Sequence, residues 1–493
     1  MNNKEPYVIL PMRFMRMPHE DVLLVNEVGE YLFVKAQDFE NLIGYSLDIS
    51  SETFLNLKGK HMITDTNLEP VIDMLATKYR TKKGFLLKFT TLHMIVVTLR
   101  CNHKCLYCHA SSEDAAANKW DMTTDTARKV VEIIFQTPSP EVKIEFQGGE
   151  PLLNWKAVTT IVESAEKANR RVKKNLSFVL CTNLTLMDRE KIQYIKDHDI
   201  LISTSLDGPK DLHDSKRVLR NGNSSYDLFT EKLELSRSVI SKDRISALMT
   251  ISRDSLDRVE DIIDEYIRLG FKTIFLRALN PFGYAKSHKD DLGYDINRFL
   301  DAYKRAINYM IELNIKGVHC REAYTALLLS RILTPFPTGF MDLQSPAGAG
   351  ICGAIYDFNG DVYPCDEARM LAKMGNKHFL MGNVHNNKYL EMFDGRILHE
   401  LTANSCVETL PGCAWCAFQP YCGADPVRNF SEQGNIIGHR PTSEFCKKNM
   451  GMLQYLLGLL KENNDNINDV FWSWITRHPL ERAEHVESNR ETC

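Results

Sequence analysis

Three closely spaced cysteines carry the strongest chemical signal in the sequence. Cys101, Cys105 and Cys108 are separated by three and two residues, in a loop that follows an apolar, strand-like run. Thiolates are soft ligands that suit iron–sulfur clusters or zinc. A structural zinc site takes four ligands, and no fourth cysteine follows within this loop, although His103 and His109 are near. Three thiolates can instead hold three irons of a 4Fe–4S cluster and leave the fourth iron open for a substrate or cofactor.

A glycine pair followed by glutamate stands further along, in Gln147-Gly-Gly-Glu-Pro151. Two glycines allow a backbone to approach a ligand closely, and the carboxylate of Glu150 can accept hydrogen bonds from an ammonium group. Because the motif follows the strand-like run 142–147, it lies where βα architectures gather ligand groups. Taken alone, the motif would favour a simple turn.

Short polar side chains follow two further strand-like runs. Cys181-Thr182-Asn183 ends one run, and Ser203-Thr-Ser205-Leu-Asp207-Gly208-Pro209 ends the next. Such groups suit ribose hydroxyls or a carboxylate if the strand ends meet at one edge of a parallel sheet. Asp207-Gly208-Pro209 is also typical of a turn, and Cys181, inside an apolar run, is typical of a small buried hydrophobe.

Most of the other cysteines cluster in the C-terminal part of the chain. Thirteen cysteines without an export signal favour metal ligation over a disulfide framework. A zinc ribbon is the alternative, but it would use four ligands, so a larger group favours more than one site. The run 355–363, with Asn359-Gly360 as its turn, predicts a hairpin. The clustered cysteines are Cys352, Cys365, Cys406, Cys413, Cys416, Cys422 and Cys446.

The composition excludes several classes of function. The chain of 493 residues is 44% hydrophobic and 25% charged, with a formal net charge of −4. No global field therefore draws it to nucleic acid or to an anionic membrane. No run approaches the length of a transmembrane helix, and the start shows no export signal. We expect a cytoplasmic protein of several domains, without nucleic-acid or membrane partners, in a reducing, low-oxygen compartment.

The middle of the chain alternates between strand-like and helical runs. Near-continuous apolar strands separated by amphipathic helices predict a parallel sheet covered by helices. The pattern alone allows a barrel or a doubly wound sheet. The expected strands are 93–99, 142–147, 176–182, 200–206, 245–251 and 273–279. The expected helices are about 123–136, 155–174, 188–197, 226–241 and 255–269.

Residues 1–90 precede the cysteine loop and predict a separate small α+β domain. The segment 22–34 has the pattern of a hairpin with its turn at 26–29, and helical periodicity follows in 36–43 and 68–79. This pattern resembles the winged-helix element with which peptide-modifying enzymes bind a leader peptide by adding a strand. A purely structural cap is the alternative.

The C-x3-C-x2-C loop and the Gly-Gly-Glu motif together resemble the signature of the radical S-adenosylmethionine (SAM) superfamily. The resemblance implies an α/β fold with a partial (β/α)6, TIM-like barrel, and SAM bound at the open iron of the cluster. It implies that the Gly-Gly-Glu motif holds the SAM amino group. Arg217, which ends a segment like the family's D-G-x4-H-D-x2-R, would meet the SAM carboxylate. The implied SAM contacts are Tyr107, Gly148, Gly149, Glu150, Thr182, Asn183, Ser205 and Arg217.

The C-terminal cysteines resemble the SPASM extension, which carries two auxiliary 4Fe–4S clusters. The resemblance assigns the second auxiliary cluster to Cys413, Cys416, Cys422 and Cys446. We assign the first auxiliary cluster to Cys352, Cys365 and Cys406. Cys406 enters this set because Pro426 stands where the family usually has a further cysteine. Cys320, Asp425 or an open, substrate-binding position are the alternatives for the fourth ligand.

The predicted organisation has five parts. They are an N-terminal domain (1–90), a radical SAM core (91–285), a helical linker region (286–345), a SPASM domain (346–450) and a C-terminal helix and tail (451–493).

Radical SAM enzymes with SPASM extensions mostly modify ribosomally made peptides. The segments 10–16 and 413–426 and the overall layout look most like the maturases of the His-Xaa-Ser peptide system. That resemblance implies a precursor peptide whose side chains are joined by a carbon–carbon, cyclophane-type cross-link through a 5′-deoxyadenosyl radical. It also implies an external flavodoxin- or ferredoxin-type reductant. Asp366, Glu367 and Asp425, beside predicted cluster ligands, are the candidate catalytic acids.

Two alternatives have the same cysteines. An anaerobic sulfatase-maturing enzyme would share these domains and oxidise a cysteine or serine to formylglycine. A non-catalytic iron–sulfur electron carrier would keep the clusters but would have no need of Gly148-Gly149-Glu150. Cleavage of SAM separates the carrier from the two enzymes.

Overall fold

The computed structural model describes residues 6–17 and 20–480. Cys493 and the end of the predicted C-terminal tail lie outside the described residues.

A mixed sheet of eight strands forms the centre of the molecule, in the order β12-β11-β10-β9-β6-β15-β16-β17. The strands from β6 to β12 are parallel to their neighbours and follow one another without reversal. This order is that of a singly wound, barrel-like sheet, not of a doubly wound one. The five strands are β6 (Leu92–Thr98), β9 (Glu141–Gly148), β10 (Asn175–Cys181), β11 (Ile200–Ser205) and β12 (Ile245–Leu248).

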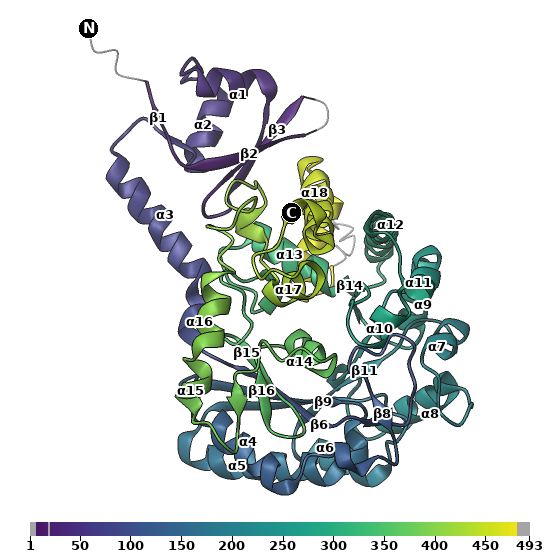
Figure 1. The fold of residues 1–493 in the computed structure, drawn as a ribbon. Coiled ribbons are helices and arrows are strands. Elements are labelled where there is room, and N and C mark those ends of the chain that lie inside the picture. The colour runs from purple at the N-terminus through teal and green to yellow at the C-terminus, as the bar shows by residue number, and fades with distance from the viewer. Residues whose placement is uncertain (1–5, 18–19, 481–493) are drawn as a thin grey trace, which may run out of the picture.

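Helices between these strands cover one face of the sheet (Figure 1). Each buries an apolar stripe and exposes a charged one, as the periodicity of the sequence predicts. The short helix α7 (Lys210–Lys216), which follows the Asp207-Gly208-Pro209 turn, was not predicted. The other helices are α4 (Thr124–Ile134), α5 (Trp155–Val172), α6 (Arg189–Asp197), α8 (Ser225–Arg237) and α9 (Val259–Arg268).

The predicted sixth strand of the sheet is wrong. Only β13 (Thr273–Ile274) forms there, and it pairs with β14 (Arg321–Glu322) in a separate two-stranded sheet. The central sheet continues instead on the other side of β6, where β15 (Gly353–Tyr356) pairs in parallel. Hydrophobic pattern identifies a strand but not its neighbour, so the sequence could not reveal this pairing.

The predicted C-terminal hairpin is confirmed and completes the central sheet. β15 and β16 (Asp361–Tyr363) are antiparallel, and Gly360, with φ +87°, occupies the turn. β17 (Gly382–Asn383) adds the last antiparallel strand. The hairpin is therefore a part of the same sheet as the cysteine loop, whereas the sequence suggested a separate domain.

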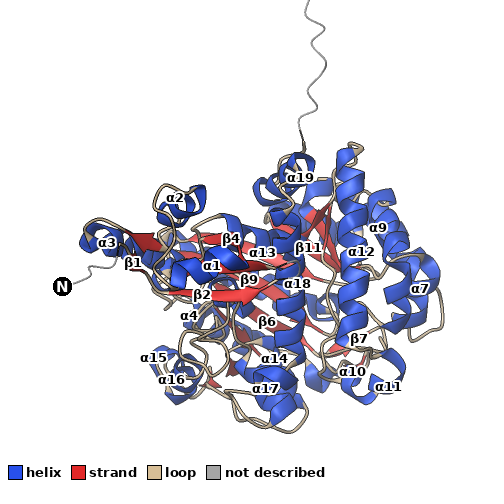
Figure 2. Ribbon diagram, turned by 90° about the horizontal axis from the view of Figure 1, so that it is seen from above, coloured by secondary structure: helices blue, strands red, loops and turns tan. Residues whose placement is uncertain are grey.

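The N-terminal residues form a second, smaller core. β3 (Asp21–Asn26) and β4 (Tyr31–Lys35) are the predicted hairpin, and α1 (Ala36–Ile43) and α3 (Leu68–Lys82) are the predicted helices. β2 (Met12–Arg16) and α2 (Glu52–Gly59) are additional. Figure 2 shows these elements at one side of the molecule, and α7, α9 and α12 (Ile296–Ile315) at the other. The core residues are Tyr7, Val22, Leu24, Val34, Phe39, Leu42, Leu47, Phe54, Leu57, Met62 and Ile63.

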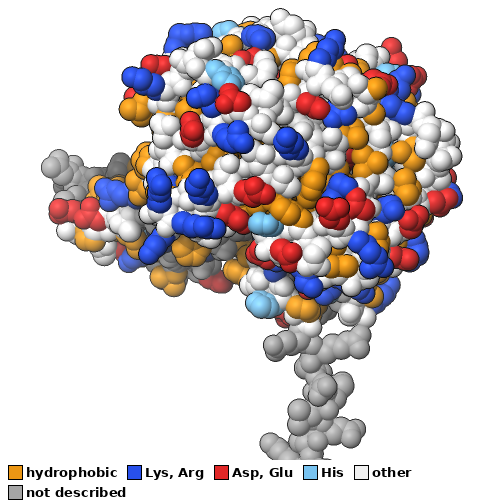
Figure 3. Space-filling model, turned by 90° about the horizontal axis from the view of Figure 1, so that it is seen from below, with side chains coloured by type: hydrophobic (Ala, Val, Ile, Leu, Met, Phe, Trp, Pro, Cys, Tyr) orange, Lys and Arg blue, Asp and Glu red, His pale blue; other side chains and the backbone are white. Residues whose placement is uncertain are grey.

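Of the later helices, α13, α14, α17 and α18 lie on the side of the sheet opposite α4, α5 and α6 (Figure 1). No helix among the described residues has the length and apolar character needed to cross a membrane. Lys and Arg side chains alternate with Asp and Glu over the face seen from below (Figure 3), in keeping with the small net charge. The later helices are α13 (Ala323–Leu333), α14 (Asp366–Lys373), α15 (Tyr389–Phe393), α16 (Arg396–Ala403), α17 (Pro426–Gln433), α18 (Glu444–Lys461) and α19 (Asp465–Thr476).

Candidate active site and cluster-binding cysteines

One cavity of about 500 Å³ connects the cysteine loop with α14, α17 and α18. It opens where the parallel strands end, the position at which βα folds gather ligand groups. Of the residues singled out in the sequence for the SAM site and for catalysis, all but Glu150 line it. They are Cys101, Cys105, Tyr107, Cys108, Gly148, Gly149, Thr182, Asn183, Ser205, Arg217, Asp366, Glu367 and Asp425.

The cysteine loop is held by backbone hydrogen bonds to the segment after α7. Lys104 N donates to Val218 O at 2.7 Å and Leu106 N to Lys216 O at 3.0 Å. Burial raises the pKa of the Cys105 thiol to about 12. A ligand that needs this thiolate must therefore supply compensating positive charge, as a bound metal cluster does.

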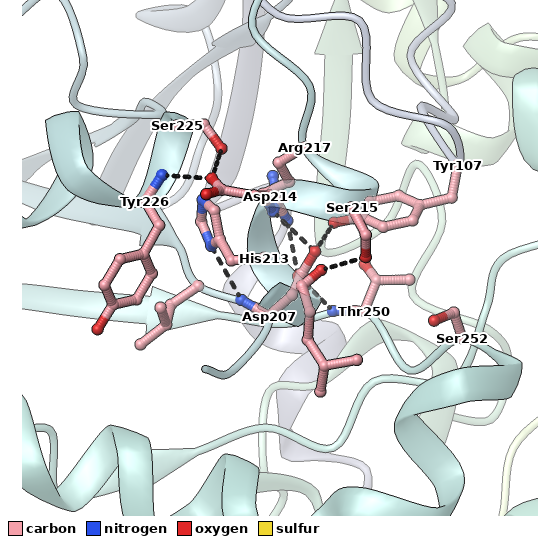
Figure 4. Close-up of polar contacts among 12 residues, drawn as sticks. Tyr107, Asp207, His213, Asp214, Ser215, Arg217, Ser225, Tyr226, Thr250 and Ser252 are labelled. Carbon is pink, nitrogen blue, oxygen red and sulfur yellow. Dashed lines mark hydrogen bonds and ion pairs between the residues drawn. The ribbon is translucent and has the colours of Figure 1, made fainter. Parts of the chain in front are cut away.

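Tyr107, within the loop, is fixed by a buried charged network (Figure 4). Its hydroxyl donates to Asp207, and the guanidinium of Arg217 lies over its ring, 5.3 Å from the centroid. Arg217 Nε and Nη2 donate to the two oxygens of Asp207 at 3.1 and 3.2 Å. Thr250 N also donates to Asp207, at 3.2 Å. Arg217 thus lines the cavity with its charge already paired, and Asp207, interpreted in the sequence as a turn residue, joins three strand ends.

Gly148 and Gly149 are required by contact between backbones. A Cβ atom on Gly148, at φ +134°, would lie 2.0 Å from Thr98 O, and one on Gly149 would lie 2.2 Å from Arg100 O. Gly149 N donates to Thr98 O at 2.9 Å. The sequence analysis explained these glycines by approach to a ligand. In the structure their first role is to let the end of β9 lie against the start of the cysteine loop.

Glu150 is buried beneath the cavity and does not line it. Its carboxylate accepts hydrogen bonds from Thr182 Oγ1 at 2.7 Å, Asn183 N at 2.8 Å and Leu152 N at 3.1 Å. Burial raises its pKa to about 7. As placed, Glu150 positions the loop after β10, and its backbone N–H donates to Arg100 O at 2.7 Å.

Thr204 borders the cavity and was not selected in the sequence analysis. It is 2% exposed, and its Oγ1 has no hydrogen-bond partner in the described structure. Alternation along β11 places its side chain on the opposite face of the sheet from those of Ser203 and Ser205. The hydroxyls that face the cavity from β11 are therefore those of Ser203 and Ser205.

These features fit a cluster-bound, polar cofactor. Three free thiols, the hydroxyls of Ser203 and Ser205 and a closely packed glycine turn meet in one cavity. Among the described residues, no three His, Cys, Asp or Glu side chains are arranged as ligands of a single metal ion. A 4Fe–4S cluster takes each thiolate on a different iron, so its ligands lie farther apart than those of one ion.

Four C-terminal cysteines lie close enough to influence one another. The pKa of Cys446 is raised to about 12, first by burial and then by Cys422, Cys413 and Cys416. Arg440 is 8% exposed beside these thiols, and its Nε has no hydrogen-bond partner in the described structure. A buried guanidinium beside these thiols, with one N–H left unsatisfied, fits an anionic thiolate cluster.

The first auxiliary set is less compact. Cys352 and Cys365 are buried at the two ends of the β15–β16 hairpin, whereas Cys406 Sγ contacts Thr402 O at 3.5 Å. No contact between Cys406 and the other two is recorded in the described residues, and this set stays a prediction. Cys320 lies in the core, where its thiol meets Asn314 and Met310 O. We therefore do not count Cys320 as a further ligand of the first auxiliary cluster.

Several acids meet at the inner part of the cavity. Asp366 lies 3.9 Å from His109 Nε2 and 3.5 Å from Arg369 Nε. The pKa of Asp425 is raised to about 8 by burial, then by Asp342 and Glu367. Asp342 has its own pKa raised to about 6, also by burial and then by Glu367. Asp342 stands in the chain far from the other acids, so no sequence motif could have grouped it with them.

A comparison with family models identifies the part of the chain that builds this site. Residues 95–266 match the Radical SAM superfamily. These residues carry the cysteine loop and the Gly-Gly-Glu turn, so the similarity to the radical SAM superfamily falls on the part of the chain that builds the cavity.

Curated relatives differ in how much of the chain they share. An uncharacterized protein of Methanocaldococcus jannaschii is 30% identical over 190 residues, which are 38% of this chain. The alignment spans 63% of that relative's own length, less than two thirds. The cysteine-type anaerobic sulfatase-maturating enzyme of Clostridium perfringens is 25% identical over 376 residues, 74% of this chain and 96% of that enzyme.

Solved structures show the same fold. The structure described as anSMEcpe with bound AdoMet superposes with a TM-score of 0.64 at 19% identity, over 79% of this chain and 99% of that one. Streptococcus suis SuiB bound to precursor peptide SuiA gives a TM-score of 0.53 at 14% identity, over 89% and 99%. At these identities the likeness shows the α/β radical SAM fold alone.

Replacement of Gly149 by alanine tests the backbone contact. Gly149→Ala should lower the free energy of unfolding by about 3 kcal/mol or more, because the new Cβ overlaps backbone oxygens that cannot move independently. Gly458→Ala, on α18 with no atom within 4 Å of the new Cβ, should be neutral or slightly stabilising. Urea denaturation under anaerobic conditions measures both, and equal midpoints would contradict the contact.

Replacement of Asp207 tests the buried ion pair. Asp207→Asn leaves the Arg217 guanidinium, whose side chain is 12% exposed, without its counter-charge, and we expect a loss of about 2–3 kcal/mol of stability. The matched control is Asp227→Asn in the exposed Lys210–Asp227 pair, which should leave the midpoint unchanged. A similar shift in both variants would show that the network around Tyr107 is not a structural anchor.

Proposed function

We propose that this chain is a radical SAM enzyme that oxidatively modifies a ribosomally synthesised peptide by joining side-chain carbons. The single observation that carries the proposal is the cavity. It joins the three-thiol loop at one end to acids and further cysteine-bearing segments at the other. An electron carrier has no need of such an enclosed space beside its cluster.

In this proposal Cys101, Cys105 and Cys108 hold the SAM-binding 4Fe–4S cluster. When bound, the cluster and SAM together supply a 5′-deoxyadenosyl radical able to take hydrogen from an unactivated carbon. SAM is proposed to lie against Tyr107, Gly148, Gly149, Thr182, Asn183, Ser205 and Arg217. Glu150 positions the Thr182–Asn183 loop from below.

The chain's own residues then perform three tasks. The sheet and α18 enclose the cavity and exclude water from a reactive species. Asp366, Glu367 and Asp425 line it as candidate acceptors of a proton from the substrate. Tyr324, a lining residue, donates to Asn449, whose amide contacts Cys422 Sγ at 3.7 Å.

The last of these contacts gives the substrate's electron an exit. Formation of a new bond between two side chains removes two hydrogens, so one electron must leave after the first hydrogen is taken. An auxiliary cluster at Cys413, Cys416, Cys422 and Cys446 would receive it through the short contact from the cavity wall. A second auxiliary cluster is proposed at Cys352, Cys365 and Cys406, and an external flavodoxin- or ferredoxin-type protein as reductant.

A peptide substrate is supported by what the fold neighbours bind. SuiB was solved with a precursor peptide, and anSMEcpe with the Kp18Cys peptide. The His-Xaa-Ser system stays our proposal for the peptide's class, on the resemblance of residues 10–16 and 413–426. The N-terminal sheet is proposed to bind a leader segment, with a structural cap as its alternative. Twelve free thiols among the described residues fit a reducing cytoplasm.

Formation of formylglycine is the second candidate function. The sulfatase-maturating relative is similar over nearly its whole length, which favours this reaction as well. The two products differ in mass. A cross-link removes two hydrogens from the peptide, whereas formylglycine from cysteine replaces the elements of hydrogen sulfide by oxygen. Mass spectrometry of a candidate peptide therefore separates them.

Substitution in the cysteine loop tests the catalytic class. With dithionite and SAM, Cys105→Ala should produce less than about 1% of the 5′-deoxyadenosine made by the unsubstituted protein, because one iron loses its ligand. Cys181→Ala, in the same cavity but contacting Glu145, should retain cleavage. If the unsubstituted protein consumed no SAM, the electron-carrier alternative would hold.

Iron content tests the auxiliary clusters. Three 4Fe–4S clusters correspond to about twelve irons per chain, and Cys446→Ala should lower this to about eight. Cys320→Ala is the control, because that thiol lies in the core and not among the four C-terminal cysteines. An unchanged iron content in the Cys446 variant would remove this cysteine from the ligand set.

A further inference from the structure

Three carboxylates line the inner cavity without forming a salt bridge. Asp342, Glu367 and Asp425 all border it, and none has an ion-pair partner in the described part of the chain. We refer to them as the acidic trio. Buried carboxylates normally find a cation, because desolvation otherwise disfavours their charged form.

The acidic trio is held in place by the backbone. Asp425 caps α17 and accepts from Arg428 N at 2.9 Å, and Glu367 accepts from Asn280 Nδ2 at 3.3 Å. Asp342 is brought to the same place by Gly423, where a Cβ would lie 2.2 Å from Asp342 O. The three acids are therefore fixed near one another without a salt bridge. Burial and their mutual repulsion raise the pKa of Asp342 and of Asp425, and a cation placed among them would lower both.

The cations of the cavity do not balance these charges. Arg369 is near Asp366 and Arg428 pairs with Glu432, so both are accounted for. Arg277 and Lys448 line the cavity and face Asp342, and Lys448 also faces Asp425, but neither forms an ion pair. Lys448 Nζ lies over the rings of Tyr324 and Phe445, at 5.1 and 5.4 Å.

The three acids of the acidic trio thus outnumber the two cations of the cavity that form no salt bridge. The space between them favours a positive charge.

A second feature indicates an oxygen atom of a ligand. Arg369 lines the same cavity and is 1% exposed, yet its Nη1 has no hydrogen-bond partner in the described structure. A buried guanidinium N–H without an acceptor is costly, so an acceptor from the ligand would complete it. The cavity therefore offers carboxylates for a cation and a donor for a carbonyl oxygen.

We propose that the acidic trio binds the side chain of a lysine or arginine residue in the substrate peptide. Arg369 then donates to a backbone carbonyl of that residue, which fixes it beside the carbon to be modified. The inference rests on the proposed function only in taking a peptide as the occupant of the cavity. It adds to the proposed function that the substrate peptide carries a lysine or arginine residue beside the carbon to be modified.

Binding of small probes tests the subsite without turnover. The holoenzyme, reconstituted anaerobically with SAM and without reductant, is titrated with Nα-acetyl-lysine amide and with Nα-acetyl-norleucine amide, followed by ligand-observed NMR. The two probes differ essentially in the charged group. We expect the lysine probe to bind at least about tenfold more tightly, since only it can place a cation among the carboxylates.

Charge-neutral variants assign the effect to the acidic trio. Asp342→Asn and Asp425→Asn should each weaken the lysine probe about five- to tenfold and leave the norleucine probe unchanged. Asparagine remains a good helix cap, so the second variant keeps α17. Glu145→Gln removes a carboxylate from the β9 wall of the same cavity and should leave the preference intact.

Three results would overturn the proposal. They are equal binding of the two probes, tighter binding of Nα-acetyl-glutamate amide, and variants that lose turnover but keep the preference for lysine. The third result would mean that the acids act only in proton transfer and do not bind the lysine side chain. Binding is measured without SAM cleavage, so the two proposals can fail separately. If the proposed chemistry fails but the preference for lysine is retained, the subsite stands. If the chemistry is found but the preference for lysine is absent, only the subsite is removed.

Discussion

The contact between the end of β9 and the start of the cysteine loop is the constraint on which the site depends. Gly149 N and Glu150 N donate to Thr98 O and Arg100 O, at 2.9 and 2.7 Å. The two backbones can approach this closely only because two consecutive residues lack a Cβ.

That contact extends through side chains to a third strand. The carboxylate of Glu150 holds the Thr182–Asn183 loop, and Asn183 Nδ2 donates to Asn102 Oδ1, back in the cysteine loop, at 2.9 Å. Three strand ends thus form a closed circuit of hydrogen bonds. This circuit fixes the positions of the three thiols, so they are in place before any cofactor binds.

The sequence predicted what is local and missed what is long-range. The strands β6 to β12 and their helices, the two hairpins and the cysteine loop follow from periodicity and turn residues, which act over a few positions. The pairing of β15 with β6 joins residues about 260 positions apart, and no pattern encodes it. Asp342 was missed for the same reason, because the packing of Gly423 against its backbone brings it into the acidic part of the cavity. Sequence motifs thus identify the residues of the SAM-binding end, whereas only the fold shows what lies opposite.

The two ends of the cavity are built on different principles, and this divides their roles. At the cysteine loop the charge of Arg217 is paired with Asp207, and this pair holds that end in place. At α14 and α17 the acidic trio has no salt bridge, and Arg369 Nη1 has no hydrogen-bond partner in the described structure, a cost that a bound ligand would offset. We therefore propose that the barrel, whose fold is shared with relatives of different activity, performs the chemistry and that the C-terminal helices select the substrate. On this proposal, a change of substrate would require changes on α14, α17 and the loop at Asp342, while the three-strand circuit stays the same.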